Sequence, residues 1–478
     1  MGFVIEESDE ILTSHSGLAL VGLLLGKTQL SARLNALPVP GRAYTEISNQ
    51  DVAYAYLGLL CQGKSDFDHI EPLRQDEFFP EALTISNVPS SPTLRQRLDL
   101  VAPEEKCDWQ SVILEESADL LSKVGVYLAP IVLGDGHREY LPLDIDVSPF
   151  DNSGTKKEGV SRTYKGCDGY APIFAYLGQE GYAVHVEFRT GSTHCQKGTA
   201  AFLAQSIRYA QRISDKRLLV RLDAGNDSVE NLVVCRADET SADFIVKKNL
   251  RKENPNAWLL TAEQHGTYTE PRAGKKVYRG SILSPMKGLE KPVRMVFEVI
   301  ERTIQSDGQA LLIPSIEVNV YVTSLPEAPE VIIDLYHAHG TMEQFHSEIK
   351  TDLDLERLPS GKFATNDLVL HFGVLAYNLL RIIGQESLRE QDAPIRKKAE
   401  RRRIRTVIQN LITLAAKMTR HARQTRLRFG RGNRWLPVFR RLYEGKERPM
   451  YPHVNASLKR RGYSPADKFT DSSLHMQK

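Results

Sequence analysis

The sequence predicts a mixed α/β protein in which a sheet-forming middle part lies between two helical ends. Apolar residues recur at helical spacing in the first part, strand-like apolar runs begin at Glu139, and helical texture returns at about Ala328. The 478 residues suffice for two to four domains, with 41% apolar and 26% charged residues, as in ordinary globular chains. A net charge of +2 creates no global field, so any charged partner must be bound locally.

The N-terminal part is predicted to be helical. The apolar runs Gly17–Gly26 and Val52–Cys61 fit buried helices, and the first is too short to span a bilayer. A third helix is expected in Ser91–Leu98, where serine and proline start it. Arg95 and Arg97 near its start are of the types that touch bases and phosphates, although a solvated helix face fits them equally well.

The middle part is predicted to form a sheet with a specific strand order. Strands are expected at Tyr140–Val147, Tyr170–Gly178, Tyr182–Arg189, Arg217–Asp223 and Asp243–Lys248, with a helix at Gly198–Ser214. The succession of three strands, a helix, a strand, a helix and a strand is that of a ribonuclease H-like core. In that core, three antiparallel strands are extended by parallel strands through crossover helices.

Two further segments complete the predicted architecture. A β-rich insertion is indicated by the segments Trp258–Thr261, Lys275–Ile282, Val293–Glu301 and Ala310–Thr323. A long apolar helix at Phe363–Ile383 is expected to pack on the sheet. We therefore expect a helical DNA-binding domain at 1–130, the core in two parts at 131–249 and 326–392, the insertion at 250–325, and a basic helical region at 393–478.

The basic C-terminal region is the clearest electrostatic signal in the chain. Arginines recur from Arg396 to Arg441, and acidic residues are nearly absent from this stretch. Such clustering is typical of a surface that binds a polyanion, and it favours nucleic acid over an ordinary solvated helix.

Three acidic residues are placed to form a metal site. Asp223 closes an apolar strand, where a buried carboxylate needs a partner such as a cation, although it could instead cap the following turn. Asp144 and Asp146 share one face of another strand, and Asp146 is nearer its end. Glu343 lies seven residues after Tyr336 and seven before Lys350, so one helical stripe carries all three. Alone, Glu343 fits a solvated helix face.

Three carboxylates on two strands and a helix can hold two Mg²⁺ or Mn²⁺ ions, which suits phosphoryl transfer without a side-chain nucleophile. Other chemistries have weaker support. His185, His194 and Cys195 lack an orienting third group, and His337, His339 and His346 lack zinc-site spacing. No Gly-x-x-x-x-Gly-Lys-Ser/Thr loop is present, which argues against a nucleotide cofactor. The five scattered cysteines fit a reducing cytosol.

These motifs resemble the DDE transposases of bacterial insertion sequences, in the cut-and-paste group with a β-rich insertion. That group carries Tyr-x2-Arg-x3-Glu-x6-Lys, which Tyr336, Glu343 and Lys350 match, while His339 stands in place of arginine. The segments around Asp146 and Asp223 are similar to the first and second acid motifs of the family. The likeness extends over nearly the whole chain.

The resemblance implies a specific activity and site. Asp146, Asp223 and Glu343 would be the catalytic, metal-binding residues, with two ions once DNA is bound. Tyr336, His339 and Lys350 would contact DNA phosphates. Trp258 in the insertion would stack on a flipped base if a strand hairpin forms, although a place in the core of the insertion fits Trp258 better.

The same resemblance implies the partners and location. These are double-stranded DNA in the form of terminal inverted repeats and target, a homodimer within a synaptic complex, no membrane, and a cytoplasmic place at the nucleoid. Two alternatives remain open: a catalytically dead DNA-binding protein on the same fold, which the His339 substitution favours, and a ribonuclease H-like nuclease that cuts without joining strands.

Overall fold

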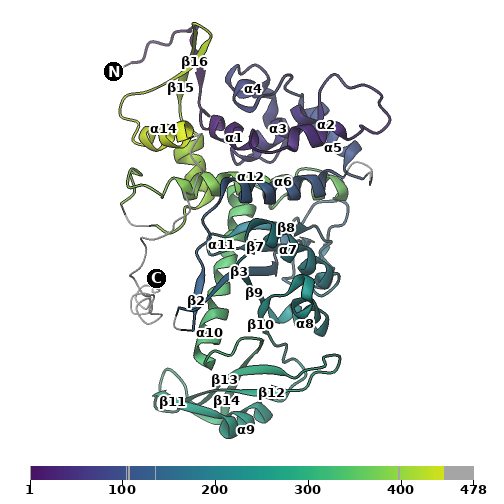
Figure 1. Cartoon of the computed structure of the whole chain (residues 1–478), viewed down its shortest axis with the longest axis vertical. Helices are drawn as coiled ribbons and strands as arrows, with labels where there is room; N and C mark the ends of the chain where they lie inside the picture. The colour runs from purple at the N-terminus through teal and green to yellow at the C-terminus, as the bar shows by residue number, and fades with distance from the viewer. Residues whose placement is uncertain (1, 104, 106–107, 135, 397–398, 446–478) are drawn as a thin grey trace.

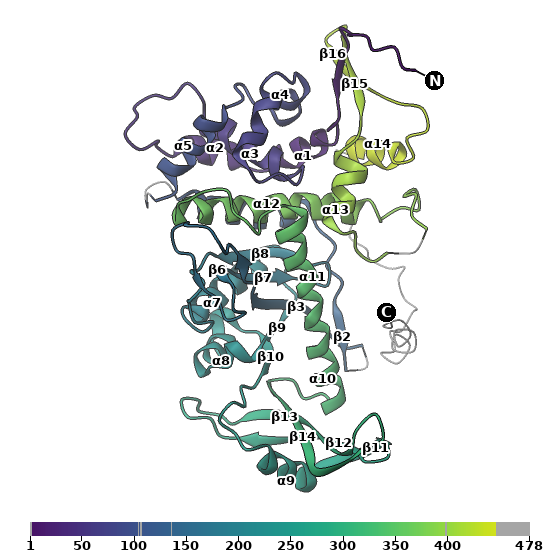
Figure 2. The ribbon, with the colours of Figure 1, turned by 180° about the vertical axis from the view of Figure 1, so that it is seen from behind.

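The computed structural model describes residues 2–103, 105, 108–134, 136–396 and 399–445. The molecule is elongated (Figure 1). The N-terminal helices lie at one end, the central sheet lies below them, and the strands of the insertion form the opposite end. The view from behind shows one long helix crossing between the N-terminal helices and the sheet (Figure 2).

The N-terminal helices confirm the helical prediction for this part of the chain. Side chains of Ser48 and Ser90 cap two of them by accepting hydrogen bonds from backbone N–H groups, and Pro92 occupies the first turn of the second. Their apolar faces form one core with the long helix beneath. The helices are α1 (Leu18–Leu25), α2 (Leu30–Ala36), α3 (Asn49–Leu60), a 3₁₀ helix (Phe67–Arg74), α4 (Phe78–Leu83), α5 (Ser91–Val101) and α6 (Trp109–Val124).

The central sheet has the strand order that the sequence predicts. Its core strands are β3 (Arg138–Val147), β7 (Ile173–Leu177), β8 (Tyr182–Glu187), β9 (Arg217–Leu222) and β10 (Asp243–Lys247). Their spatial order is β10-β9-β3-β7-β8; β7 is antiparallel to both β3 and β8, whereas β9 and β10 run parallel to β3. The crossover helices α7 (Thr199–Ile213) and α8 (Val229–Arg236) connect the parallel strands. This is the topology expected of a ribonuclease H-like core.

The insertion continues this sheet instead of forming a separate one. Strand β14 pairs with β10 of the core, so the whole sheet has ten strands, with short β2 (Ile131–Leu133) paired to β3. The added strands are β11 (Gly266–Arg272), β12 (Lys275–Ser284), β13 (Val293–Ile304) and β14 (Ala310–Thr323). The strand expected at Trp258 is wrong, because that residue lies in helix α9 (Pro255–His265), which Asn254 caps and Pro255 starts.

Helix α12 (Phe363–Glu386) is the central packing element. It is long and apolar enough to cross a bilayer, but 94% of its most apolar window is buried within the protein, so it serves as a core helix. Asn378 on this helix accepts a hydrogen bond from the N–H of Ala183 and donates to the carbonyl of Ala183 and to Ser117. One buried amide thus joins α12, the edge strand β8 and α6, and it satisfies backbone groups that an edge strand leaves unpaired.

The C-terminal region differs from the helical prediction. Helices α13 (Ile404–Val407) and α14 (Leu436–Glu444) flank a β-hairpin, β15 (Ala416–His421) and β16 (Gln424–Phe429). Strand β15 also pairs with β1 (Ile11–Thr13) near the N-terminus. The two terminal regions, predicted as separate domains, therefore share one sheet. The part of the predicted C-terminal region beyond residue 445 lies outside the described residues.

Replacing Asn378 by leucine is expected to destabilise the protein by about 2–4 kcal/mol, because the two backbone groups of Ala183 would be buried without partners. The measurement is the free energy of unfolding in urea. Asn366, buried in the same helix and bonded to both backbone groups of the nearby Ser360, provides a comparison within α12. Equal stability of Asn378→Leu and the wild type would show that this amide does not join the elements.

Candidate active site

Two aspartates meet at one end of the central sheet. In the parallel ladder between β3 and β9, Ile145 pairs with Leu222, so the next residues, Asp146 and Asp223, lie side by side where the two strands end. Both side chains are partly exposed. The carboxyl ends of parallel strands are where functional groups gather in open α/β sheets.

These two carboxylates repel each other and have no cationic side chain between them. Burial, together with the charge of Asp146, raises the pKa of Asp223 above its usual value. Asp223 accepts a hydrogen bond from the Asn226 amide, and Asp146 accepts one from the N–H of Val147. Among the described residues, neither forms an ion pair with lysine or arginine; the ring of His346 lies 3.7 Å from Asp146. A bound cation would relieve this repulsion.

Asp144 has the opposite environment, which separates its role from that of Asp146. Both of its carboxylate oxygens accept hydrogen bonds from Arg221, at 2.6 and 2.7 Å, and Nδ1 of His339 lies 2.9 Å from one of them. Burial opposes the ionisation of Asp144, but the charges of Arg221 and His339 outweigh it and hold its pKa below the usual value. Asp144 is therefore a neutralised structural group.

The same cluster fastens the helical segment that carries Glu343. Arg221 also donates to the carbonyl of Leu335 at the end of α10 (Pro329–His337), and His339 lies in the 3₁₀ turn that follows, Ala338–Thr341. Glu343 is then exposed in the first turn of α11 (Met342–Ser347). The cluster thus holds this segment against the two strands that carry Asp146 and Asp223.

The single stripe predicted for Tyr336, Glu343 and Lys350 is wrong in its geometry. A 3₁₀ turn and a π-helical turn, Glu348–Asp352, interrupt the α-helix, so a spacing of seven no longer places side chains on one line. The described residues contain no group of three or more His, Cys, Asp or Glu side chains placed to hold a metal ion. The structure therefore brings Asp146 and Asp223 together and leaves Glu343 beside them on the neighbouring helix.

Lys350 and Tyr336 lie close to the two aspartates. The ammonium of Lys350 donates to the carbonyl of Pro149, just after β3, and lies 5.4 Å from the centre of the Phe150 ring. Tyr336 packs on Tyr321. Burial, followed by the charge of Asp223, raises the pKa of Tyr336. Their phosphate contacts stay predictions.

Three of the predicted DNA contacts do not fit their positions. His339 is 7% exposed and its Nδ1 is paired with Asp144, which does not fit a contact with DNA. Arg97 is 5% exposed and donates to Asn49 and to the carbonyl of Ile47. Trp258 is 9% exposed and donates to Glu253, as expected of a residue in the core of the insertion. Arg95 is half exposed and lies 3.8 Å from Asp68, and its predicted contact with DNA stays a prediction.

The sequence reasoning missed Tyr164. This residue is 68% exposed, and its hydroxyl lies 3.4 Å from the carbonyl of Val147, next to Asp146. Its pKa is raised by burial of the hydroxyl and then by the charges of Asp146, Asp223 and Glu343, so it stands near all three acids. The signal in the sequence is a tyrosine followed by Lys165 and Gly166, a turn placed between two predicted strands.

Tyr164 sits at the tip of a small sheet that follows β3. This sheet consists of β4 (Phe150–Asp151), β5 (Ser161–Arg162) and β6 (Asp168–Tyr170), in the order β4-β6-β5. The turn between β5 and β6 closes with a hydrogen bond from Thr163 to Cys167, and Gly166 adopts a φ of +81°, which favours glycine.

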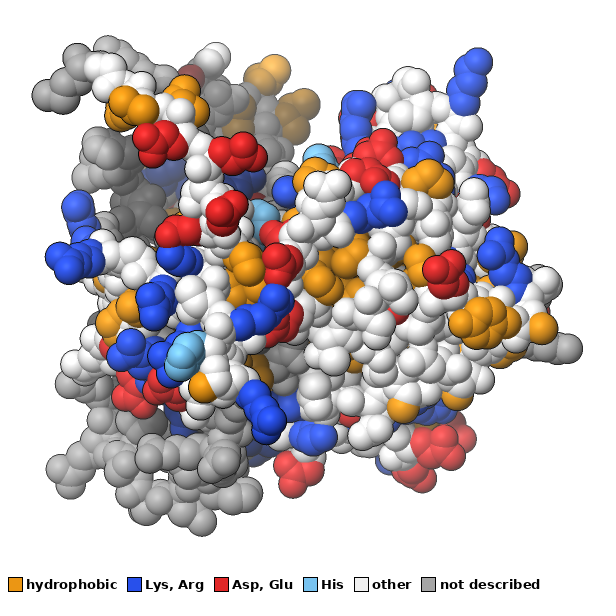
Figure 3. All heavy atoms as spheres, turned by 90° about the horizontal axis from the view of Figure 1, so that it is seen from above, with side chains coloured by type: hydrophobic (Ala, Val, Ile, Leu, Met, Phe, Trp, Pro, Cys, Tyr) orange, Lys and Arg blue, Asp and Glu red, His pale blue; other side chains and the backbone are white. Residues whose placement is uncertain are grey.

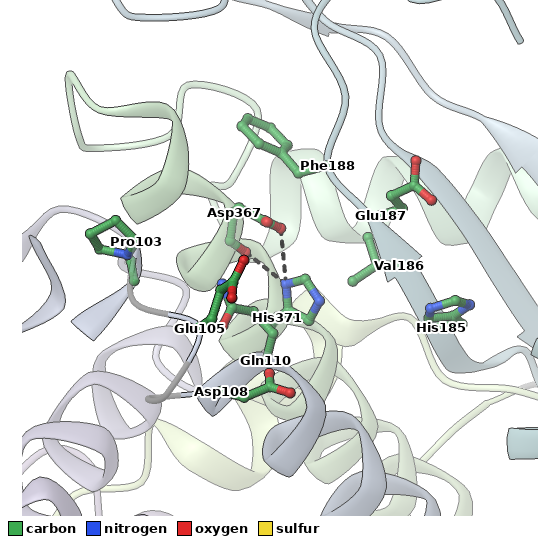
Figure 4. Close-up of a pocket in the computed structure, with 11 residues that line it drawn as sticks. Pro103, Glu105, Asp108, Gln110, His185, Val186, Glu187, Phe188, Asp367 and His371 are labelled. Atoms are coloured by element: carbon green, nitrogen blue, oxygen red, sulfur yellow. Dashed lines mark hydrogen bonds and ion pairs between the residues drawn. The ribbon is translucent and has the colours of Figure 1, made fainter. Parts of the chain in front are cut away.

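A pocket of about 430 Å³ lies apart from these acids, with His185, Glu187, Asp367 and His371 in its lining. Figure 4 shows Asp367 holding His371 there. Burial lowers the pKa of His185 to about 3 and raises that of Cys195, which agrees with rejecting both as a nucleophilic pair. Asp146, Asp223 and Glu343 are not among the residues that line this pocket.

Comparison with known proteins identifies the family. The sequence model of the family described as Transposase DDE domain group 1 matches residues 4–447. The chain belongs to this family, whose members are DDE transposases, metal-dependent enzymes that transfer phosphoryl groups on DNA. No curated protein matches the sequence. Among solved structures, a cryo-EM structure of the piggyBac transposase synaptic complex with hairpin DNA is similar, with 9% identity, a TM-score of 0.40, and coverage of 85% of this chain and 83% of that chain.

Replacing Asp144 or Asp146 by asparagine, one at a time, is expected to give opposite effects on the free energy of unfolding. Asp144→Asn should cost about 3–5 kcal/mol because it leaves Arg221 buried without its partner, whereas Asp146→Asn should be neutral or stabilising because it removes a like-charge contact. Urea unfolding at neutral pH measures both.

Low pH should reduce the stability of the wild-type protein because Asp144 becomes protonated. The pKa of Asp144 is lowered in the folded state, so its stabilisation is present above its unfolded pKa of about 3.9 and is lost as pH falls below it. Similar losses of unfolding free energy for Asp144→Asn and Asp146→Asn would contradict the assignment of different roles to Asp144 and Asp146.

Proposed function

We propose that this protein is the transposase of an insertion sequence, which binds the terminal inverted repeats of its element, cuts DNA at the element ends and joins the ends to a target. The observation that carries the proposal is the contrast between Asp144, which Arg221 neutralises, and the adjacent pair Asp146 and Asp223, which no lysine or arginine of the described chain neutralises. Family membership supplies the reaction class.

Asp146 and Asp223 are suited to bind a hard divalent cation. Their carboxylates lie at the ends of adjacent strands, and the repulsion between the two carboxylates favours binding of a cation. Glu343 is the proposed third ligand; because it is exposed on α11, its side chain is free to move on DNA binding and complete the set. Mg²⁺ or Mn²⁺ bound there would lower the pKa of the attacking hydroxyl and stabilise the leaving oxygen.

The remaining residues would position the DNA. Lys350, beside the end of β3, would neutralise the phosphate that is cut, and Tyr336 would pack near it. In the first step, water attacks the phosphorus at the element end and the bond to the 3′ oxygen breaks. In the second step, the freed 3′-hydroxyl attacks a target phosphodiester, so one P–O bond forms and another breaks. A dimer in a synaptic complex would bring both ends together, and the nucleoid is the proposed place of action.

Tyr164 is the aromatic residue best placed to stack on a base near the cut, the role that the sequence suggested for Trp258. Its ring is exposed, whereas Trp258 is buried in the insertion. Lys165 beside it in the turn adds a cation for the neighbouring phosphate.

Asp223→Asn is expected to abolish cleavage and joining of a duplex that carries an element end, while leaving DNA binding intact, because the amide cannot replace a carboxylate ligand. The test substrates are labelled duplexes taken from inverted repeats on either side of the coding sequence, incubated with Mn²⁺ and resolved on a denaturing gel. Asn226→Ala, which removes only the hydrogen-bond donor to Asp223, is a neighbouring control expected to keep partial activity.

Three results would change this conclusion. Normal cleavage by Asp223→Asn would refute the metal-site assignment. Specific binding without cleavage by the wild type would indicate a DNA-binding protein without activity. Cleavage without joining would indicate a nuclease.

Tyr164→Ala is expected to lower the cleavage rate about 5–150-fold, as the loss of one base-stacking contact worth about 1–3 kcal/mol implies. Tyr164→Phe should keep most of the rate because the ring remains. Tyr44, exposed in the N-terminal region, offers a matched substitution away from the three acids. If Tyr164→Ala cleaved as fast as Tyr44→Ala, the stacking role would be excluded.

A further inference from the structure

The three-stranded sheet of the terminal regions has two different faces. On the inner face, Ala416 pairs with Phe429 and Met418 with Leu427, and Phe429 packs on Phe439 of α14. On the outer face, Lys417 lies opposite Arg428, Thr419 opposite Arg426, and His421 opposite Gln424. Side chains alternate between the faces of a sheet, so this register places two arginines of β16 on the same outward surface.

The two arginines that β16 places on this outer face have no acidic partner among the described residues. No acidic residue occurs in the sequence between Glu400 and Glu444. Arg420 is neutralised by Glu77 and Glu81 of α4, and Lys417 pairs with Glu10. By contrast, Arg423, Arg426 and Arg428 are exposed and form no ion pair within the part of the chain that the structure describes.

The hairpin also projects from the body of the protein. Figures 1 and 2 show β15 and β16 rising beside the N-terminal helices at one end of the molecule. Seen from above, the side of the molecule that carries the hairpin shows lysine, arginine and histidine side chains, with acidic side chains beside them (Figure 3). The strands join through Ala422 and Arg423, which both adopt left-handed backbone angles, with φ of 50° and 61°, so the tip is a tight turn that carries an arginine.

We propose that Arg426 and Arg428 of this outer face, together with Arg423 of the turn, bind double-stranded DNA by entering a groove; these three residues are termed here the arginine ribbon. The inference rests on the proposed function and adds to it the element that grips the duplex. A two-stranded β-ribbon fits the major groove of B-DNA, which is about 12 Å wide. Arginines two residues apart on a strand lie about 6.8 Å apart and can reach phosphates along one wall of the groove.

The architecture explains why the arginine ribbon can present its charges to a partner. The inner face is anchored by the apolar contacts of Met418 and Leu427 and by the ion pairs of Arg420 with α4. The outer face then holds Arg426 and Arg428 next to each other, where their like charges repel. A polyanion removes this repulsion, and binding of each phosphate releases a condensed counterion.

The test measures binding of the full-length protein to a fluorescent duplex in EDTA, so that cleavage plays no part. The double variant Arg426→Ala/Arg428→Ala is expected to bind at least 10-fold more weakly. Its slope of log affinity against log salt concentration should fall in magnitude by about 2, which corresponds to two lost phosphate contacts. Arg426→Lys/Arg428→Lys should keep most of the salt dependence because the charges remain.

Arg208→Ala/Arg236→Ala is the matched control. It removes the same charge from two exposed arginines on α7 and α8, and it should leave affinity and slope close to those of the wild type. Thermal unfolding of each variant shows whether the fold is kept; the outward-facing substitutions should not change it.

Specific outcomes overturn the proposal. Wild-type affinity of Arg426→Ala/Arg428→Ala, or an equal loss in the control, would refute the arginine ribbon as the DNA contact. If Arg426→Ala/Arg428→Ala lost binding to anionic phospholipid vesicles but kept binding to the duplex, the surface would be assigned to a membrane instead. Because the measurement needs no metal or cleavage, a wild type that binds duplex DNA but never cuts it would refute the proposed reaction and leave the arginine ribbon supported.

Discussion

The buried cluster of Asp144, Arg221 and His339 is the interaction on which the active site depends. Arg221 joins β9 to β3 through Asp144 and also reaches the carbonyl of Leu335, while His339 brings the following turn onto the same carboxylate. The strands that carry Asp146 and Asp223 are thereby held against the helical segment that carries Glu343. Bidentate pairing is geometrically strict, so the cluster restricts this segment more than apolar packing alone could.

The cluster also explains how three aspartates so close together can have different roles. One arginine neutralises Asp144, which removes it from metal chemistry and makes it a positioning residue. The remaining pair, Asp146 and Asp223, keeps its repulsion, which a bound divalent cation would relieve. His339, which stands at the arginine position of the motif, pairs with Asp144 in this structure.

The sequence was sufficient for the features that depend on local pattern. Strands β3, β9 and β10 and helices α7 and α12 follow from apolar runs, and their order predicts the core topology. The sequence was insufficient where contacts between residues distant in the chain determine the structure. The hairpin of β15 and β16 is completed to a three-stranded sheet by β1, about 400 residues earlier in the chain. The arginine-rich sequence there resembles a helix. The burial of Arg97 and Trp258 depends on residues distant in the sequence, Asn49 and Phe297.

The central claim is that Asp146 and Asp223 bind the metal and that Asp144 does not. Anomalous diffraction from crystals of the protein with a DNA end and Mn²⁺ tests it most directly. We expect a manganese peak about 2.1 Å from oxygens of both Asp146 and Asp223, with Asp144 still paired to Arg221. A peak on Asp144, or manganese bound only at residues away from the ends of β3 and β9, would contradict the account.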